Sequence, residues 1–119
     1  MITLDLPIPP SVNDLYANRK RGRGPGRYKT KEYKDWLYRA DQSFLAQKWR
    51  IDYLHGPCDL HIKVPAKMRG DVDNRIKAVA DYLVSRQITA DDRFYRKVSI
   101  ERCEYVSCCV VTVTPVGAA

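Results

Sequence analysis

Residues 60–85, which read LHIKVPAKMRGDVDNRIKAVADYLVS, decide the fold because two hydrophobic periodicities meet within them. From Leu60 to Val64 every second residue is apolar, which predicts a strand with one buried face that ends at Pro65. From about residue 73 to residue 85 the apolar residues recur at helical spacing, which predicts a helix. A charged segment joins the two elements, and a functional site is expected there.

Two acids, Asp71 and Asp73, alternate at this strand-to-helix junction. If residues 69–72 are extended, both side chains point to the same side, with Cβ atoms roughly 7 Å apart, and can bind one hard cation. Lys77 follows Asp73 by one helical turn, so its ammonium group can face the same cation. Mg²⁺ held by carboxylates can activate water and neutralise the charge that develops on a phosphodiester. The stretch therefore predicts a divalent-metal site for phosphodiester chemistry.

Two carboxylates rarely suffice for such a site, and the pair Asp91-Asp92 after the helix can supply a third ligand. A purely structural role is the alternative. Asp73 or Asn74 is the expected N-cap of the helix, and in the structural alternative Asp73 has this role as a cap. Lys77 would then form ordinary salt bridges with Asp73 and Asp81, one turn away on either side.

The chain is basic, and part of this charge is concentrated ahead of the first expected helix. Lys and Arg number 21 against 14 Asp and Glu, which gives a net charge of +7, and the isoelectric point is near 9.4. No acid interrupts residues 19–31, and Tyr16 and Tyr28 offer rings on which bases can stack. A solvated surface loop is the alternative, but contact with nucleic-acid phosphates is favoured. The basic residues expected to bind DNA are Arg19, Lys20, Arg21, Arg23, Arg27, Lys29, Lys67 and Arg69.

The remaining periodicities predict an α+β fold. Alternating apolar residues over residues 2–8 predict an opening strand. Thr30 can cap a helix that runs to about Trp49. Two closing antiparallel strands are expected around residues 98–100 and 111–113. The order strand, helix, strand, helix, strand, strand places the helices on one face of a small mixed sheet. The apolar stripe expected in the core consists of Tyr33, Trp36, Leu37, Ala40 and Phe44.

Length and composition predict a single cytosolic domain over residues 1–119. There is neither a leader pattern nor an apolar run of the roughly 18 residues that a membrane span requires. The four cysteines form no CxxC pair, so free, buried thiols are expected. His55, Cys58 and His61 form an H-x2-C-x2-H string, but a fourth zinc ligand at suitable spacing is missing.

The order of these features resembles the RusA family of Holliday-junction resolvases, small endodeoxyribonucleases of bacteria and their phages. The resemblance runs from Ile2 to about Thr114. It comprises an opening strand, then Pro9-Pro10-Ser11 with Asn13 and Tyr16, a basic loop, a helix, Asp71-Val72-Asp73-Asn74 with Lys77, and finally Asp91-Asp92.

The resemblance implies roles for individual residues and for the assembly. Asp71, Asp73 and Asp92 would bind Mg²⁺, and Lys77 would be needed for cleavage, with Asp91 nearby. The family acts as a homodimer with one site per subunit, which nicks opposing strands of a four-way junction symmetrically. A two-fold protein suits a two-fold junction.

Two positions depart from the family pattern. Gly70 stands directly before Asp71, where members can carry a longer arginine run. Residues 87–90 lack a bulky aromatic that can occur before the acid pair. The sequence as a whole predicts a Mg²⁺-dependent endonuclease for Holliday junctions. The alternatives are a metal nuclease with looser specificity for branched DNA and a non-catalytic basic module that binds DNA.

Overall fold

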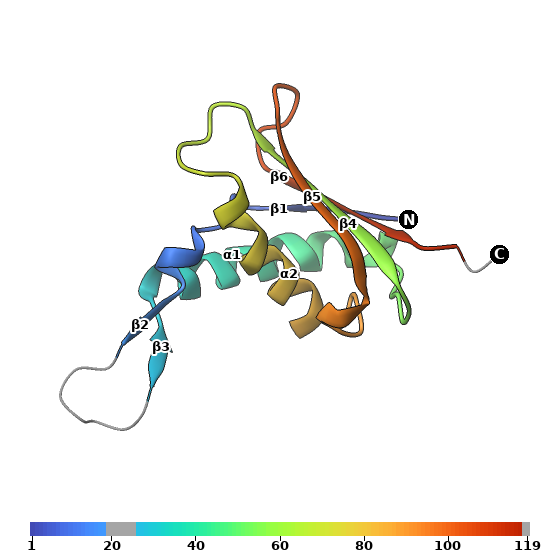
Figure 1. Cartoon of the computed structure of the whole chain (residues 1–119), viewed down its shortest axis with the longest axis horizontal. Helices are drawn as coiled ribbons and strands as arrows, with labels where there is room; N and C mark the ends of the chain where they lie inside the picture. Colours follow the sequence, from blue (N-terminus) through green and yellow to red (C-terminus); the bar gives the residue numbers. More distant parts are fainter. Residues whose placement is uncertain (19–25, 118–119) are drawn as a thin grey trace.

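Within residues 1–18 and 26–117, which the computed structural model describes, the main sheet has four strands (Figure 1). They are β1 Ile2–Leu6, β4 Cys58–Pro65, β5 Tyr95–Cys103 and β6 Cys109–Pro115. Their order in the sheet is β1-β6-β4-β5. β4 pairs in parallel with β5 and antiparallel with β6, and β1 pairs antiparallel with β6. The sheet is therefore mixed, as predicted.

In the described chain two α-helices, α1 Lys31–Gln47 and α2 Ile76–Ser85, lie on the same side of this sheet (Figure 1). Along β4, buried and partly exposed residues alternate, so only one face of the strand contributes to the core. The other face carries polar residues such as His61. The predicted α+β class, with helices packed on one face of the sheet, is confirmed.

Shorter elements connect these layers. β2 Tyr16–Asn18 and β3 Arg27–Lys29 pair antiparallel and form what we call the β2–β3 arm. The sequence did not predict these strands, because three residues are too few to show a periodicity. The 3₁₀ turns are η1 Val12–Asp14, η2 Lys48–Arg50, η3 Asp73–Arg75 and η4 Asp92–Phe94.

The buried side of α1 follows its sequence pattern. Thr30 caps the helix, as predicted, by accepting a hydrogen bond from the Tyr33 N–H at 3.1 Å. The ring of Trp36 is buried and meets Tyr82 edge-on, with the ring centroids 5.6 Å apart. Its indole N–H donates to the Pro7 carbonyl at 2.9 Å. Trp36 therefore joins α1 to α2 and to the end of β1.

Two details of the predicted fold were wrong. Neither Asp73 nor Asn74 is the N-cap of α2, because the helical path begins earlier, at Val72, whose φ and ψ are −66° and −38°. The two closing strands run antiparallel, as predicted, but β4 lies between them. β4 has a continuous buried face, whereas Lys97 and Val98 of β5 are exposed, so β5 occupies the edge.

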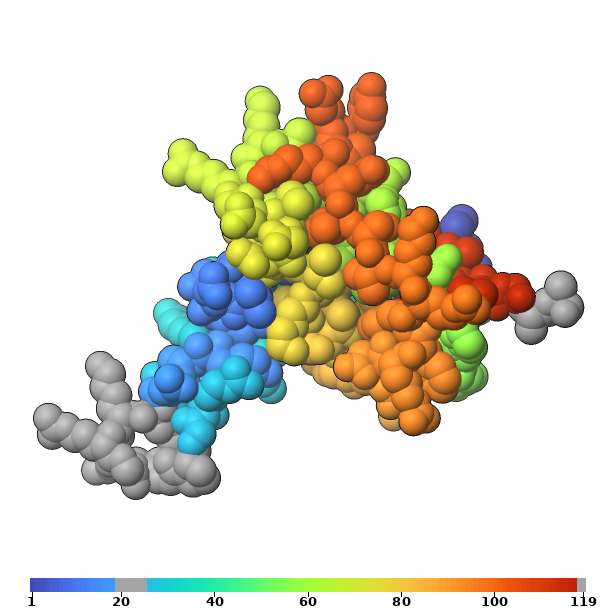
Figure 2. Space-filling view, viewed as in Figure 1, coloured from blue at the N-terminus to red at the C-terminus, as the bar shows by residue number. Residues whose placement is uncertain are grey.

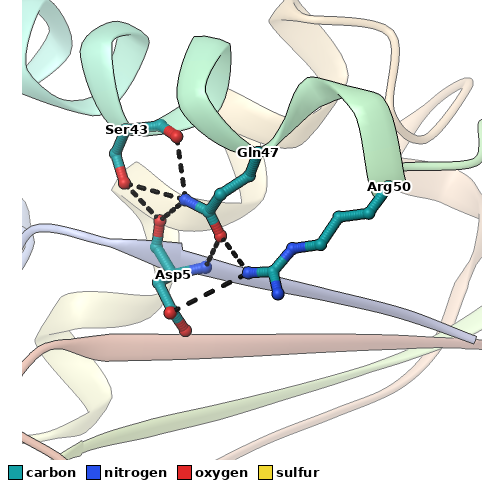
Figure 3. Close-up of polar contacts among 4 residues, drawn as sticks. All are labelled: Asp5, Ser43, Gln47 and Arg50. Carbon is teal, nitrogen blue, oxygen red and sulfur yellow. Dashed lines mark hydrogen bonds and ion pairs between the residues drawn. The ribbon is translucent and has the colours of Figure 1, made fainter.

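A glutamine of α1 holds the edge strand β1 (Figure 3). Gln47 accepts a hydrogen bond from the Asp5 N–H at 2.8 Å and donates one to the Asp5 carbonyl at 2.8 Å. Ser43 donates to the same carbonyl at 2.6 Å. Arg50 donates to the Gln47 side chain at 2.7 Å and lies 4.0 Å from the Asp5 carboxylate. These contacts satisfy outward backbone groups that an edge strand would otherwise offer to another strand.

We predict that Gln47→Ala lowers the free energy of unfolding by about 1–3 kcal/mol, because the Asp5 N–H loses its partner and the Asp5 carbonyl keeps only the hydrogen bond from Ser43. Urea denaturation of the variant tests this. Gln42→Ala, at an exposed position of the same helix, is the matched control and should change little. Equal stability of the two variants would show that Gln47 does not hold β1.

Candidate active site

Asp71 and Asp73 lie on the path from β4 to α2, but this path is not extended as predicted. Gly70 has a φ of +90°, and Val72 has helical backbone angles. Strand alternation therefore does not orient the two carboxylates toward one side. Both acids are exposed, and within the described chain neither has a hydrogen bond or ion pair with another side chain. Their oxygens are available to a ligand.

Lys77 pairs with an acid on its own helix. Its Nζ lies 3.1 Å from Asp81 Oδ2, one turn farther along α2. Of the two salt bridges in the structural alternative, the one with Asp81 forms, and the described residues show none with Asp73. Lys77 is exposed and has a long, flexible side chain, so its ammonium group can turn to a bound phosphate.

The adjacent acids Asp91 and Asp92 have different environments. Asp91 caps η4 by accepting a hydrogen bond from the Arg93 N–H at 3.1 Å, and this bond lowers its pKa. The pKa of Asp92 is raised, first by its hydrogen bond with Asp91 and by the charge of that carboxylate, and to a lesser extent by Asp81. Mutual repulsion of this kind is what a bound divalent cation relieves, so Asp92 fits the role of a metal ligand.

A cavity of about 500 Å³ lies between the β2–β3 arm, α1, α2 and η4. It is lined by Tyr16, Lys29, Tyr33, Leu37, Asp81, Val84, Ser85, Arg86, Asp91 and Asp92. One wall carries three carboxylates, and the arm contributes a lysine and a tyrosine. Burial raises the pKa of Tyr33 to about 12, so its hydroxyl stays protonated at neutral pH. A cavity with acids on one side and a basic arm on the other suits a polyanion that approaches through a metal ion.

Of the three predicted metal ligands, Asp71, Asp73 and Asp92, only Asp92 lines the cavity. Its neighbour Asp91 lines it as well, whereas Asp71 and Asp73 do not. In the part of the chain that is described, no three His, Cys, Asp or Glu side chains are close enough to hold a metal ion together. The donor chemistry nevertheless fits Mg²⁺, because Asp71, Asp73 and Asp92 are exposed carboxylates and hard oxygen donors.

The predicted DNA-binding residues fall into two groups in space. Arg27 and Lys29 lie on the arm, where the Arg27 guanidinium is 4.6 Å from the ring centroid of Tyr16. Lys67 and Arg69 are exposed in the segment before Asp71. In Figure 2 the blue and cyan strands of the arm project from one end of the molecule. The predicted positions that lie outside the described residues are Arg19, Lys20, Arg21 and Arg23.

A model of the RusA endodeoxyribonuclease family matches residues 7–114 of the 119-residue chain. The chain belongs to the RusA family. It is therefore an endodeoxyribonuclease, a hydrolase that acts on DNA. A comparison with curated proteins gave no match. The RusA match includes the β2–β3 arm, both acid pairs and Lys77.

One acid that lines the cavity was missed as a functional candidate. From the sequence, Asp81 is expected only as a salt-bridge partner of Lys77. The structure places it on the cavity wall with Asp91 and Asp92, where its charge also raises the pKa of Asp92. Its spacing from Asp73, two helical turns with Lys77 midway, was the available signal.

Other expectations from the sequence concern residues outside the candidate site. Cys58 and His61 of the histidine–cysteine string lie on opposite faces of β4, so they do not converge on one ion. His61 instead contacts Ser99 at 2.5 Å and Glu101 at 3.5 Å. The four cysteines are free, as predicted, although Cys103 and Cys108 are only partly buried. No helix of the described chain is long and apolar enough to span a membrane.

An ion pair between the helices supports one wall of the cavity. Arg86 donates to both carboxylate oxygens of Asp41, at 2.6 and 2.7 Å, and Tyr82 donates to the same carboxylate at 2.8 Å. The Arg86 hydrogen bond is the main reason why the pKa of Asp41 is lowered. Arg86 reaches Asp41 from the end of α2, so this pair fixes the spacing between α1 and α2 beside the cavity.

We predict that the Asp41–Arg86 pair makes stability depend on acidity. The pKa of Asp41 is lower in the folded state than in the unfolded state, where it is about 3.9. The ionised Asp41 therefore stabilises the fold at a pH above the unfolded-state pKa, and this stabilisation is lost as the pH falls through the folded-state pKa. Urea denaturation from pH 7 into the acid range should show that Asp41→Asn is less stable than wild type at pH 7. The difference in the free energy of unfolding should shrink as the pH falls.

The matched control is Asp35→Asn, at an exposed position of the same helix that has no ion pair within the described chain. It should show no such pH-dependent gap. A constant difference between wild type and Asp41→Asn from pH 7 into acid would contradict the assigned role of the pair.

Proposed function

We propose that the chain is a Mg²⁺-dependent, structure-selective endonuclease that resolves Holliday junctions by paired symmetric nicks in DNA recombination and repair. The observation that carries the proposal is that Asp92 and the arm residue Lys29 line the same cavity. Membership of the RusA family supplies the reaction class. The net charge of +7 supports a polyanionic substrate.

In this proposal Asp71, Asp73 and Asp92 hold Mg²⁺. The ion, when bound, would activate water and neutralise charge on the phosphoryl group. Asp91 keeps η4 in place through its hydrogen bond to the Arg93 N–H, which orients the neighbouring Asp92. Lys77 leaves Asp81 to donate to a phosphate oxygen as a point charge. Asp81 keeps the ammonium group near the site until the phosphate arrives.

The basic groups have a separate task, which is to bind the flanking backbone. Arg27 and Lys29 on the arm, with Lys67 and Arg69 before the acids, would contact phosphates on either side of the cut. Two copies of the chain would cut opposing strands, because a four-way junction has approximate two-fold symmetry and a homodimer matches it.

Asp73→Asn is predicted to lower the rate of four-way junction cleavage in Mg²⁺ by at least about 100-fold, because it removes a metal-ligand charge. Junction binding should be retained, since the basic surface is intact. Asp59→Asn is the matched control, because Asp59 lies on the sheet face that the helices leave open. Cleavage by Asp73→Asn at the wild-type rate would rule out the metal-site assignment. Binding without any cleavage by the wild type would favour the non-catalytic module.

The arm gives a second prediction. Arg27→Ala with Lys29→Ala should flatten the salt dependence of junction binding by up to about one unit of slope for each phosphate that the arm no longer neutralises. Fluorescence anisotropy over a salt series measures the slope. Lys63→Ala, on the open sheet face, is the control. An unchanged slope in the double variant would show that the arm does not contact phosphates, as expected of a solvated surface loop.

A further inference from the structure

The segment that delivers Asp71 to the site is residues 66–72, which we call the acid loop. Two backbone hydrogen bonds anchor its start: Ala66 N–H donates to Cys103 at 3.1 Å, and Met68 N–H donates to Pro65 at 3.0 Å. The rest of the loop turns away from the sheet before η3 begins (Figure 1). The position of Asp71 therefore depends on what holds the second half of this loop.

One guanidinium group binds three carbonyls of the acid loop. Arg102, near the end of β5, donates through Nη1 to the carbonyls of Ala66, at 3.3 Å, and Met68. Its Nη2 donates to the Gly70 carbonyl at 2.6 Å. These carbonyls alternate along the chain, so a single planar side chain spans the loop from its first residue to the residue before Asp71.

A second guanidinium group holds the loop from its other end. Arg75, the last residue of η3, donates to the Arg69 carbonyl at 3.0 Å and to the Pro9 carbonyl at 2.7 Å. A Cβ atom at Gly70 would lie 3.0 Å from Arg75 Nη2, and Gly70 has a φ of +90°. The turn therefore favours glycine at this position, and a Cβ atom there would also crowd the Arg75 guanidinium.

We propose that Arg102 and Arg75 are positioning residues that clamp the acid loop and thereby set the place of Asp71 for metal binding. The proposal rests on the proposed metal-dependent cleavage. Adjacent carbonyls, of Arg69 and Gly70, are bound by different guanidinium groups immediately before Asp71. The clamp fixes the backbone without using the Asp71 carboxylate, which stays free to bind the ion.

The clamp is distinguishable from a phosphate contact by the geometry of the donor. Lysine keeps the positive charge of arginine but lacks the planar fork that reaches three carbonyls at once. If Arg102 acts on the loop, Arg102→Lys impairs the metal dependence of cleavage as much as Arg102→Gln does. If Arg102 acts on DNA phosphate, Arg102→Lys preserves junction binding and Arg102→Gln weakens it.

The first experiment measures junction cleavage by the full chain as a function of Mg²⁺ concentration, with junction affinity measured in parallel. Both Arg102 variants are expected to raise the Mg²⁺ concentration for half-maximal cleavage by about tenfold while junction affinity stays unchanged. Arg96→Lys is the control, because Arg96 is exposed on the same strand and has no polar partner within the described chain. Wild-type metal dependence in Arg102→Lys, or a loss confined to junction affinity, would overturn the proposal.

The second experiment is independent of activity. Hydrogen–deuterium exchange of Arg102→Lys should show faster exchange of the acid-loop amides, with the amides of β4 and β6 unchanged. Gly70→Ala, which strains the turn and crowds Arg75 Nη2, should give the same local increase. If the acid-loop amides of Arg102→Lys exchange at the wild-type rate while the wild-type chain cuts junctions, the clamp is overturned and the proposed function is not. A wild-type chain that cuts no DNA in Mg²⁺ would overturn the proposed function and the positioning role together.

Discussion

The burial of a single sheet face beneath α1 and α2 is the constraint on which the rest of the structure depends. Trp36 and Tyr82 meet in this layer, and the side chains that face them from the sheet are buried. Lys77 and Asp81 lie on α2 itself, and the other charged groups of the site come from segments that enter or leave the layer: the arm before α1, the acid loop and η3 before α2, and η4 after it. Hydrophobic packing therefore sets the distance between groups whose own charges would drive them apart.

The electrostatic arrangement follows from that packing. The chain carries a net charge of +7, yet Asp81, Asp91 and Asp92 line one cavity wall, and the mutual effect of the last two raises the pKa of Asp92. Clustered acids in a basic protein are costly unless a cation joins them. The arm places Lys29 across the same cavity, so a DNA backbone can be held by lysine and arginine while its phosphate approaches the acids through a metal ion.

Much of the fold could be predicted from local sequence, because strands and helices leave their periodicity in the chain. The Thr30 cap, the stripe of α1 and the alternation of β4 all follow their patterns. The conformation at Val72 could not be predicted, since a short run of charged residues has no periodicity. The role of Arg102 could not be predicted either, because it binds carbonyls more than thirty positions away in the chain. This interaction exists only once β4 and β5 are paired. Gly70 looked like a missing arginine in the sequence, and the structure explains it by a turn and by the approach of Arg75.

The central claim is that these acids and the arm together cut branched DNA at a metal site. The most direct measurement is cleavage of a four-way junction in which each strand is labelled in turn, with and without Mg²⁺, beside a linear duplex of the same sequence. We predict Mg²⁺-dependent nicks at matching positions in two opposing strands, products that ligase can seal, and little cutting of the duplex. Equal cutting of junction and duplex, or cutting that persists without a divalent metal, would contradict the central claim.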